Sequence, residues 1–416
     1  MLASFGLFCW LVVAVVSGSA TGRLFRSTPP TVHLTSLVKT TSVAPGSLGA
    51  IAWPKDGEGA VAVLGSGVMG HSPRQRVVPI ASLTKMMTAY VVLADHPLRV
   101  FQSGPSFTMG QADVAAWVHA SQNDESNVAI KKGEVLTEFQ LLEALLIPSA
   151  DNVADYLALW DAKSMPAFVA KMNAAARELG LASTHYADAS GLDPGSRSTA
   201  VDQAVLAARL MANPVVRTIV RHPSIPFQVN GTVWNYNPAL GTDGIIGVKS
   251  GFTSEAGACL ATAAFRSVRG KSALVVAVAL GQPNSLVTAA TADEALLSSV
   301  TPKLELWRPS FSASTIARAS AGTSVTPLTL GKRAPRIIAW PGLRLVATVV
   351  PLREHPATGP VVAELRLSDP IGVVATLPLV SVSSPQAAPT SGSLTSATMK
   401  GRRPGALRPV ATMAGG

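Results

Sequence analysis

The sequence predicts an α+β protein, in which an antiparallel sheet and a group of helices come from separate stretches of the chain. Helical signals cluster in residues 83–212, and short β-rich runs follow from about residue 245. Residues 325–380 carry β patterns alone. A strand-like beginning, a helical middle and returning strands are typical of a sheet with segregated helices.

The composition fits a folded protein with a large core. Apolar residues make up 48% of the 416 residues and charged residues only 14%. A disordered chain has few apolar residues and many charges, and a coiled coil is rich in charge, so both classes are excluded. The 34 lysines and arginines outnumber the 24 acidic residues, which gives a net charge of +10. Such an excess favours an anionic partner such as nucleic acid, a membrane surface or a polyanionic wall.

The N-terminus predicts export. Residues 2–20 carry no charged side chain, and Leu7–Val16 is almost purely apolar. This run is shorter than the about 20 residues that span a bilayer, and the small residues up to Ala20 follow it as in a signal peptide. We therefore expect residues 1–20 to be a signal peptide and the rest of the chain to be extracytoplasmic. Because the first residues carry no Lys or Arg, a buried helix or an uncleaved membrane anchor is the alternative.

The two cysteines, Cys9 and Cys259, are too few for a disulfide framework, so the fold must rest on its apolar core. Cleavage of the signal peptide would remove Cys9. A lone thiol in an exported protein is safer when buried, and we expect Cys259 to lie in the core.

Two segments lack the periodicity of a folded domain. Residues 21–48 are rich in Thr, Ser, Pro and Val and predict a linker. Residues 381–416 are rich in Ser, Pro, Thr, Ala and Gly, carry four basic side chains and no acid, and predict a disordered basic tail. An anionic wall or membrane surface is the partner that such a tail fits.

Several helices are expected in the middle of the chain. One begins at a capping box formed by Thr137 and Gln140 and runs to Pro148. Further helices are expected over residues 152–160, over residues 164–180 and from residue 199 onward.

The β-rich runs predict strands in two groups. The first group follows the helices, covers residues 245–249, 258–265 and 273–280, and is followed by a helix over residues 287–300. In the second group, residues 343–349 and 361–367 alternate apolar and polar side chains. We assign this second group to a small all-β domain over residues 325–380.

A serine and a lysine with S-x-x-K spacing form the first candidate catalytic pair. Positions i and i+3 share one face of a helix, so the Ser82 hydroxyl and the Lys85 amine can meet. A serine hydroxyl needs a base to act as a nucleophile, and a lysine serves as that base only when it is neutral. The spacing alone is common, and it equally fits a helix residue beside a solvated charge.

Two further segments carry polar residues in unusual places. Ser149 lies between two expected helices, where its ordinary role would be a helix cap. Downstream, Lys249 lies in an apolar run on an expected strand. Buried lysines are rare unless they are paired, so Lys249 indicates a function.

In order and spacing, the three segments resemble the S-x-x-K, S-x-N and K-T/S-G motifs of penicillin-binding proteins and serine β-lactamases. The neighbouring sequence resembles the low-molecular-mass serine D-alanyl-D-alanine carboxypeptidases. The segments that carry this resemblance are ASLTKMMTAYVVL, TEFQLLEALLIPSADNVADYLA, THYADASGLD and NPALGTDGIIGVKSGFTSEAGACL. It covers roughly residues 49–300 and extends more loosely to residue 380. The resemblance implies a β-lactamase/transpeptidase-like domain over residues 49–305, with a separate helical subdomain, followed by the small β domain.

The resemblance implies a role for each motif residue. Ser82 resembles the nucleophile that forms an acyl-enzyme, Lys85 its general base, and Ser149 a relay that passes a proton to the leaving amine. No cofactor is implied, and the scattered histidines show no spacing for a zinc hydrolase.

The third motif resembles the part of the family site that binds substrate. Lys249 and Ser250 would bind the terminal carboxylate, and Gly251 would keep the strand edge clear for the peptide. The backbone N–H groups of Ser82 and Phe252 would form the oxyanion hole. The implied partners are peptidoglycan stem peptides, with β-lactam antibiotics as inhibitors.

Two positions depart from the family motifs. Ser250 stands where threonine is usual and keeps the hydroxyl. In the second motif, Asp151 occupies the usual amide position, and the amide comes one residue later at Asn152. Either Asn152 supplies the amide through a shifted helix start or Asp151 replaces it, and we favour Asn152. An aspartate beside two lysines would favour their charged forms, which works against a neutral base.

Three rival functions remain to be weighed. A class A-like β-lactamase uses an extra glutamate to activate water, and Leu192–Arg197 contains none, so a long-lived acyl-enzyme is expected. Aromatic residues do not interleave with basic clusters, which argues against a nucleic-acid partner. A catalytically weak wall-binding protein on the same fold is supported by the atypical second motif alone.

Overall fold

The computed structural model describes residues 33–37, 41–311, 315–321, 324–331, 333–351, 361–369 and 373–381. The expected signal peptide and the tail after Ser381 lie outside the described residues. Among the helices that are described, none is long and apolar enough to cross a membrane.

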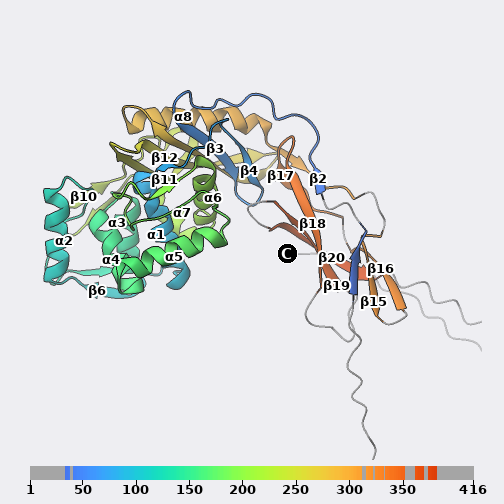
Figure 1. The fold of residues 1–416 in the computed structure, drawn as a ribbon, viewed down its shortest axis with the longest axis horizontal. Coiled ribbons are helices and arrows are strands. Elements are labelled where there is room, and N and C mark those ends of the chain that lie inside the picture. The colour runs from blue at the N-terminus through green and yellow to red at the C-terminus, as the bar shows by residue number, and fades with distance from the viewer. Residues whose placement is uncertain are drawn as a thin grey trace, which may run out of the picture. The chain divides into compact units, whose positions relative to one another are not determined.

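A five-stranded antiparallel sheet forms the centre of the first part of the fold (Figure 1), in the order β11-β12-β13-β3-β4. Its strands are β3 (Glu58–Val63), β4 (Gly67–His71), β11 (Ile245–Thr253), β12 (Gly257–Val268) and β13 (Lys271–Gln282). The three strands expected after the helices are therefore confirmed, and each is longer than its apolar run. Strand β11 lies at one edge of the sheet, where a free strand edge can receive an extended peptide.

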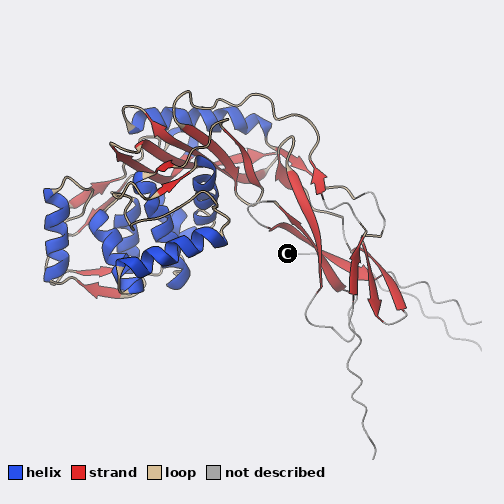
Figure 2. Cartoon of the chain, in the orientation of Figure 1, coloured by secondary structure: helices blue, strands red, loops and turns tan. Residues whose placement is uncertain are grey.

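Helices cover both faces of this sheet (Figure 2). Helix α8 (Leu286–Val300) packs against Val61 and Val275 on one face. Helix α6 (Ala200–Leu210) packs against Ala60 and Val276 on the other. Successive strand residues point to opposite faces, which is why fully buried strands such as β3 show apolar runs rather than alternation.

The remaining helices form a group on the α6 side, with α1 buried among them. They are α1 (Thr84–Asp95), α2 (Gln111–Gln122), α3 (Glu138–Leu146), α4 (Asp151–Ala162), α5 (Met165–Glu178) and α7 (Pro214–Val220). The expected capping box at the start of α3 is present, and Thr137 accepts a hydrogen bond from the Gln140 N–H. At the start of α6, the Thr199 side chain accepts from the Asp202 N–H. Helix α2 was not predicted, and it buries a single residue, Ala120.

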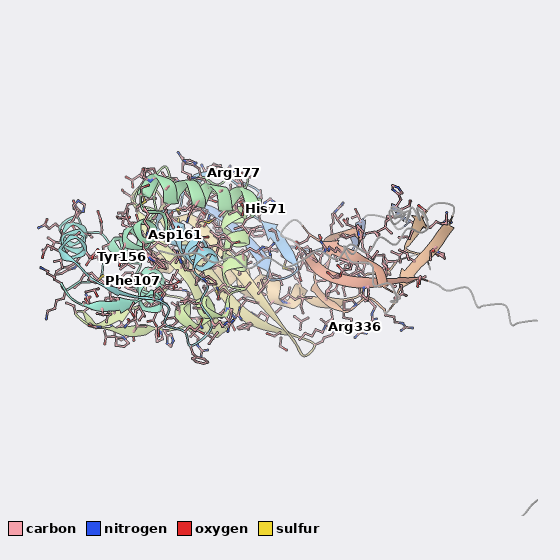
Figure 3. All side chains as sticks on the ribbon, turned by 90° about the horizontal axis from the view of Figure 1, so that it is seen from below. His71, Phe107, Tyr156, Asp161, Arg177 and Arg336 are labelled. Atoms are coloured by element: carbon pink, nitrogen blue, oxygen red, sulfur yellow. The ribbon has the colours of Figure 1, made fainter. Side chains whose placement is uncertain are left out.

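Short strand pairs and 3-10 turns lie outside the two large sheets. The paired strands are β5 (Val78–Pro79) with β8 (Arg197–Ser198), β6 (Ser106–Thr108) with β7 (Val135–Thr137), β9 (Ser224–Phe227) with β10 (Gly231–Trp234), and β14 (Glu305–Trp307) with β17 (Ile337–Ala339). The 3-10 turns are η1 (Ala81–Leu83), η2 (Thr242–Gly244) and η3 (Thr301–Lys303). Phe107 of β6 packs edge-on against Tyr156 of α4 (Figure 3), with 5.7 Å between the ring centroids. This contact ties the β6–β7 pair to the helix that carries the second motif.

A seven-stranded antiparallel sheet accounts for the β-only region, in the order β1-β15-β16-β20-β19-β18-β2. Its strands are β1 (His33–Ser36), β2 (Thr41–Val43), β15 (Ala317–Ala321), β16 (Ser324–Leu330), β18 (Arg344–Pro351), β19 (Val361–Ser368) and β20 (Val373–Ser381). The two edge strands, β1 and β2, come from residues 21–48, where we expected a linker, so that expectation is wrong for these residues. Both are short, polar and largely exposed, and therefore carry no apolar signal.

Candidate active site

The candidate nucleophile lies on a strained turn. Ser82 is the middle residue of η1, which leads directly into α1. The residue before it, Ala81, has φ of +47°, a conformation that non-glycine residues seldom adopt. Strain of this kind gathers at functional sites, where the surrounding structure holds it in place.

Lys85 lies on the first turn of α1, and its side chain is fully buried. Its Nζ donates a hydrogen bond to Ser82 Oγ at 2.9 Å. The spacing of three residues therefore brings the two groups together, although they meet across the junction of a 3-10 turn and an α-helix rather than on one continuous helix.

Two more acceptors complete the surroundings of Lys85. The Asp151 Oδ1 atom lies 2.5 Å from Nζ, in an ion pair whose aspartate side chain is 4% exposed. The backbone carbonyl of Ser190 accepts at 2.8 Å. Sequence reasoning did not single out Ser190, because a backbone carbonyl can come from any residue type.

Ser149 does not cap the helix that follows it. The N-cap of α4 is Ala150, and no side chain caps this helix. Ser149 has φ of +64°, and its buried Oγ has no hydrogen-bond partner among the described residues. Ser149 therefore does not have the ordinary role of a helix cap. Because a buried hydroxyl without a partner is costly, its position points to a role at the site.

The amide of the second motif does not reach Lys85, which differs from our expectation for Asn152. The Asn152 Nδ2 donates to the Val128 carbonyl at 3.0 Å, and Oδ1 accepts from the Val128 N–H at 3.3 Å. Helix α4 begins at Asp151, and consecutive helix residues point about 100° apart, so only one of the two can face Lys85. For Asn152 to face Lys85, helix α4 would have to begin one residue later than it does.

Lys249 is the second buried lysine of the site. It lies on β11, is 1% exposed, and its Nζ donates to the Ser250 carbonyl at 2.8 Å. Burial, and then the charge of Lys85, holds the pKa of the Lys249 ammonium well below its ordinary value of 10.5, while the Asp151 carboxylate acts in the opposite direction. Ser250, beside it, is also buried.

Gly251 is needed because β11 runs very close to the nucleophile turn. A Cβ atom at this position would lie 2.7 Å from the Ser82 backbone nitrogen and 3.1 Å from the Ala81 Cβ. The close neighbour is therefore η1 itself, and the absence of a side chain lets the strand edge approach Ser82. Phe252, the next residue, is 54% exposed.

The loop that precedes β8 closes the third side of the site. Gly191 has φ of +88°, and a Cβ there would lie 1.9 Å from the Ala81 carbonyl oxygen. The Ala189 carbonyl accepts a hydrogen bond from Thr88 Oγ1 at 2.6 Å. The segment that resembles the family at THYADASGLD is thus packed against both η1 and α1.

Within the described ranges, no group of three or more His, Cys, Asp or Glu side chains is arranged to hold a metal ion. Cys259 lies on β12, opposite Gly251, and is fully buried. Burial raises the pKa of its thiol to about 12, so this cysteine belongs to the core, as expected.

Comparison with known proteins agrees with this geometry. Residues 65–284 match the sequence profile of the D-alanyl-D-alanine carboxypeptidase family. A D-alanyl-D-alanine carboxypeptidase of Mycobacterium tuberculosis is 36% identical over 229 residues, which is 53% of this chain and 73% of that protein. The corresponding Escherichia coli enzyme, DacA, is 31% identical over 210 residues, 49% of this chain and half of that protein.

Solved structures show the same fold. A Streptomyces DD-transpeptidase is 27% identical, with a TM-score of 0.53 over 61% of this chain and 99% of that one. Penicillin-binding protein 6B of Escherichia coli is 23% identical, with a TM-score of 0.57 over 81% of this chain and 97% of that one. The predicted α+β, transpeptidase-like fold is therefore confirmed.

Proposed function

The chain belongs to the family of serine-type D-alanyl-D-alanine carboxypeptidases, enzymes of cell-wall metabolism, and from that premise we propose that it removes the terminal D-alanine of peptidoglycan stem peptides through an acyl-enzyme on Ser82. The observation that carries the proposal is the 2.9 Å contact between Lys85 Nζ and Ser82 Oγ, in a site that also contains a second buried lysine.

The first half of the reaction forms an ester on Ser82. Its Oγ attacks the carbonyl carbon of the penultimate D-alanine, and its proton passes to the neutral amine of Lys85. The oxyanion that forms accepts hydrogen bonds from the backbone N–H groups of Ser82 and Phe252, where one donor is typically worth about 10²–10³ in rate. The buried Ser149 hydroxyl, free of other partners among the described residues, relays this proton from Lys85 to the leaving amine of D-alanine as the C–N bond breaks.

The second half returns the enzyme to its starting state. Lys85, neutral again, takes a proton from the water that attacks the ester carbonyl, the bond to Ser82 Oγ breaks, and that oxygen recovers the proton from Lys85. The products are free D-alanine, released in the first half, and the shortened peptide.

The substrate carboxylate supplies the counter-charge that Lys249 lacks. Because burial disfavours the ammonium, an anion placed beside it restores the charged form and gains an interaction with little competition from water. Ser250 donates its hydroxyl to the same carboxylate. This makes recognition of a free C-terminus, and hence carboxypeptidase rather than endopeptidase activity, the expected outcome.

Asp151 takes the place of the family amide. Its carboxylate accepts from Lys85 and keeps the lysine beside Ser82, but it cannot donate as an amide would. If this ion pair held Lys85 permanently charged, the chain would be a catalytically weak wall-binding protein, which is the alternative function.

We also propose that β-lactams acylate Ser82 and are released slowly. The segment Leu192–Arg197 offers Asp193 as its carboxylate, and that side chain is occupied by the Gly195 N–H at 2.7 Å. No glutamate is placed there to activate water, in contrast to class A β-lactamases.

Members of this family work outside the cytoplasm on the cell wall, and we propose that this chain is exported and that its basic tail associates with an anionic wall or membrane surface. The tail carries four basic side chains and no acidic one. Deleting residues 382–416 should then reduce co-sedimentation with cell walls or with anionic liposomes, and unchanged binding would count against the tail.

The decisive experiment is incubation of the protein with benzylpenicillin, followed by intact-mass measurement and mapping of the adduct. One adduct on Ser82, absent from S82A, together with release of D-alanine from a pentapeptide, supports the proposal. A folded protein that forms no adduct would instead favour the wall-binding alternative.

A further inference from the structure

One carboxylate organises the loop that closes the site. Asp188 Oδ2 accepts hydrogen bonds from the Ser190 hydroxyl and from the backbone N–H groups of Gly191 and Leu192, each at 2.8 Å. The Asp193 N–H adds a longer contact at 3.2 Å. On the other side, Oδ1 accepts from the Ser196 hydroxyl at 2.5 Å. A single side chain thus folds the loop around itself.

The shape of this loop determines where the Ser190 carbonyl lies. That oxygen accepts from Lys85 Nζ at 2.8 Å, and it is two residues from the carboxylate that fixes the turn. The neighbouring contacts, from Thr88 to the Ala189 carbonyl and between Gly191 and Ala81, hold the loop against the same helix start. A change in the turn therefore moves the oxygen that contacts Lys85.

This oxygen matters because of how a lysine acts as a base. A neutral amine has two N–H bonds and one lone pair, and the lone pair must point at the proton that it removes. Lys85 has three neighbours: Asp151 Oδ1, the Ser190 carbonyl and Ser82 Oγ. Because the first two can only accept, they keep the two N–H bonds of the neutral amine. The third position, from which the charged amine donates to Ser82 Oγ, then holds the lone pair.

We propose that Asp188 is a positioning residue for acylation: by folding the loop, it places the Ser190 carbonyl so that the lone pair of neutral Lys85 is aimed at Ser82. The inference rests on the proposed acylation of Ser82. The hydrogen bonds of the Asp188 carboxylate go to its own loop, and it acts on Lys85 through the backbone of Ser190.

The test is the kinetics of acylation by a fluorescent penicillin, separated into the maximum rate constant and the half-saturating concentration. D188A leaves the turn without its acceptor and should lower the maximum rate constant by about 10- to 100-fold, as expected for a misplaced catalytic group. The half-saturating concentration should change less than about twofold, because Lys249 and Ser250 lie on a different element. D188N should recover most of the rate, since its amide oxygen can accept from the loop N–H groups while its NH₂ donates to Ser196 Oγ.

A matched control comes from Asp202 on α6. Its Oδ2 accepts from the Ser183 N–H and the Thr184 hydroxyl, each at 2.8 Å, so it anchors the start of the same segment without a contact to Ser190. D202A should lower the melting temperature but leave the acylation rate constant within about twofold. Assays of all variants are made below the lowest melting temperature, which circular dichroism supplies.

If D188A does not fold, S190A decides the matter, because it keeps the carbonyl and removes one donor to Asp188. The loss of one hydrogen bond should lower the maximum rate constant by roughly 2- to 10-fold. The inference is overturned if folded D188A or S190A is acylated at the wild-type rate, if D202A loses as much, or if the loss lies wholly in the half-saturating concentration. Wild-type protein that is not acylated would overturn the proposed function itself, and the two failures are thus distinguishable.

Discussion

The two buried lysines of the site, Lys85 and Lys249, differ in how their positive charges are compensated. Lys85 has a carboxylate at 2.5 Å and two further acceptors. Lys249 donates to a backbone carbonyl of its own strand, and its pKa is held well below the ordinary value by burial and by the charge of Lys85. Lys85 thus has its counter-charge in the free protein. Lys249 donates to a carbonyl only, and an anion that binds beside it would supply the counter-charge. This difference separates a residue that handles protons from one that recognises a carboxylate.

The largest expected effect is that of removing the compensated lysine. K85M should lower the rate of acylation by benzylpenicillin by about 10²–10⁴, the usual contribution of a general base. It should also lower the melting temperature, because Asp151 is left as a buried charge without a partner, a change that costs about 3–5 kcal/mol. Stopped-flow acylation and thermal unfolding followed by circular dichroism measure the two effects. A variant that acylates within tenfold of wild type would exclude Lys85 as the base.

The uncompensated lysine predicts the opposite change in stability. K249M should raise the melting temperature of the ligand-free protein at pH 7, because it removes a buried amine whose charged form is disfavoured. A gain of about 1 kcal/mol in the free energy of unfolding would raise the melting temperature by at most about 2–4 °C. The lowered pKa means that Lys249 binds more protons in the unfolded chain than in the folded one. The contribution of Lys249 to stability therefore rises as the pH approaches about 10.5, and the advantage of K249M shrinks.

The same variant should bind substrate less tightly than the wild type, although it is the more stable protein. K249M should weaken binding of peptides that end in a free carboxylate and leave C-terminally amidated peptides little affected. Isothermal titration of the two peptides with S82A, and with S82A that also carries K249M, measures this. Equal loss for both peptides would show that Lys249 maintains the site without recognising the carboxylate.

Replacing Asp151 by asparagine should make Lys85 resemble Lys249. D151N keeps an acceptor for Nζ but removes the negative charge, so a modest loss of stability is expected, smaller than that of K85M. Because the carboxylate that favours the charged form of Lys85 is gone, the neutral amine that takes the Ser82 proton is more available, and acylation at pH 7 should become several-fold faster. N152D, one residue along, is the control, because Asn152 contacts Val128 instead. Slower acylation by D151N would mean that the carboxylate itself takes part in proton transfer.

How much of this site could be predicted from the sequence depends on whether side chains or backbone atoms form it. The S-x-x-K spacing predicts that the Ser82 and Lys85 side chains meet, and they lie in hydrogen-bond contact. The predicted core position of Cys259 is also confirmed. The choice between Asp151 and Asn152 turned on the first residue of α4, and helix boundaries are known from sequence only to within a few residues.

Other features cannot be predicted from local sequence patterns. The Ser190 carbonyl is a backbone atom, and any residue there could supply it. Strands β1 and β2 are edge strands formed by polar residues, whose pairing depends on partners far along the chain at β15 and β18. In both cases the information lies in tertiary contacts, which a local reading of composition and periodicity does not contain.

A buried carboxyl group that lies away from the two lysines predicts a further dependence of stability on pH. Glu138, at the start of α3, is 1% exposed, and its Oε1 has no partner among the described residues. With no counter-charge to match that of Asp151 on Lys85, burial raises its pKa from 4.5 to about 7. The folded protein therefore binds more protons than the unfolded chain between these values, and wild-type stability falls as pH rises through this window.

E138Q should remove that dependence, because its amide carries no titrating proton. Its melting temperature should match that of wild type near pH 4.5 and exceed it increasingly up to about pH 7, after which the gap stays constant. E178Q, at the exposed end of α5, is the matched control for the loss of a helix carboxylate. Differential scanning calorimetry over pH 4–8 measures both variants. A gap that is the same at every pH would mean that folding does not change the pKa of Glu138, and that the cost of its burial is compensated.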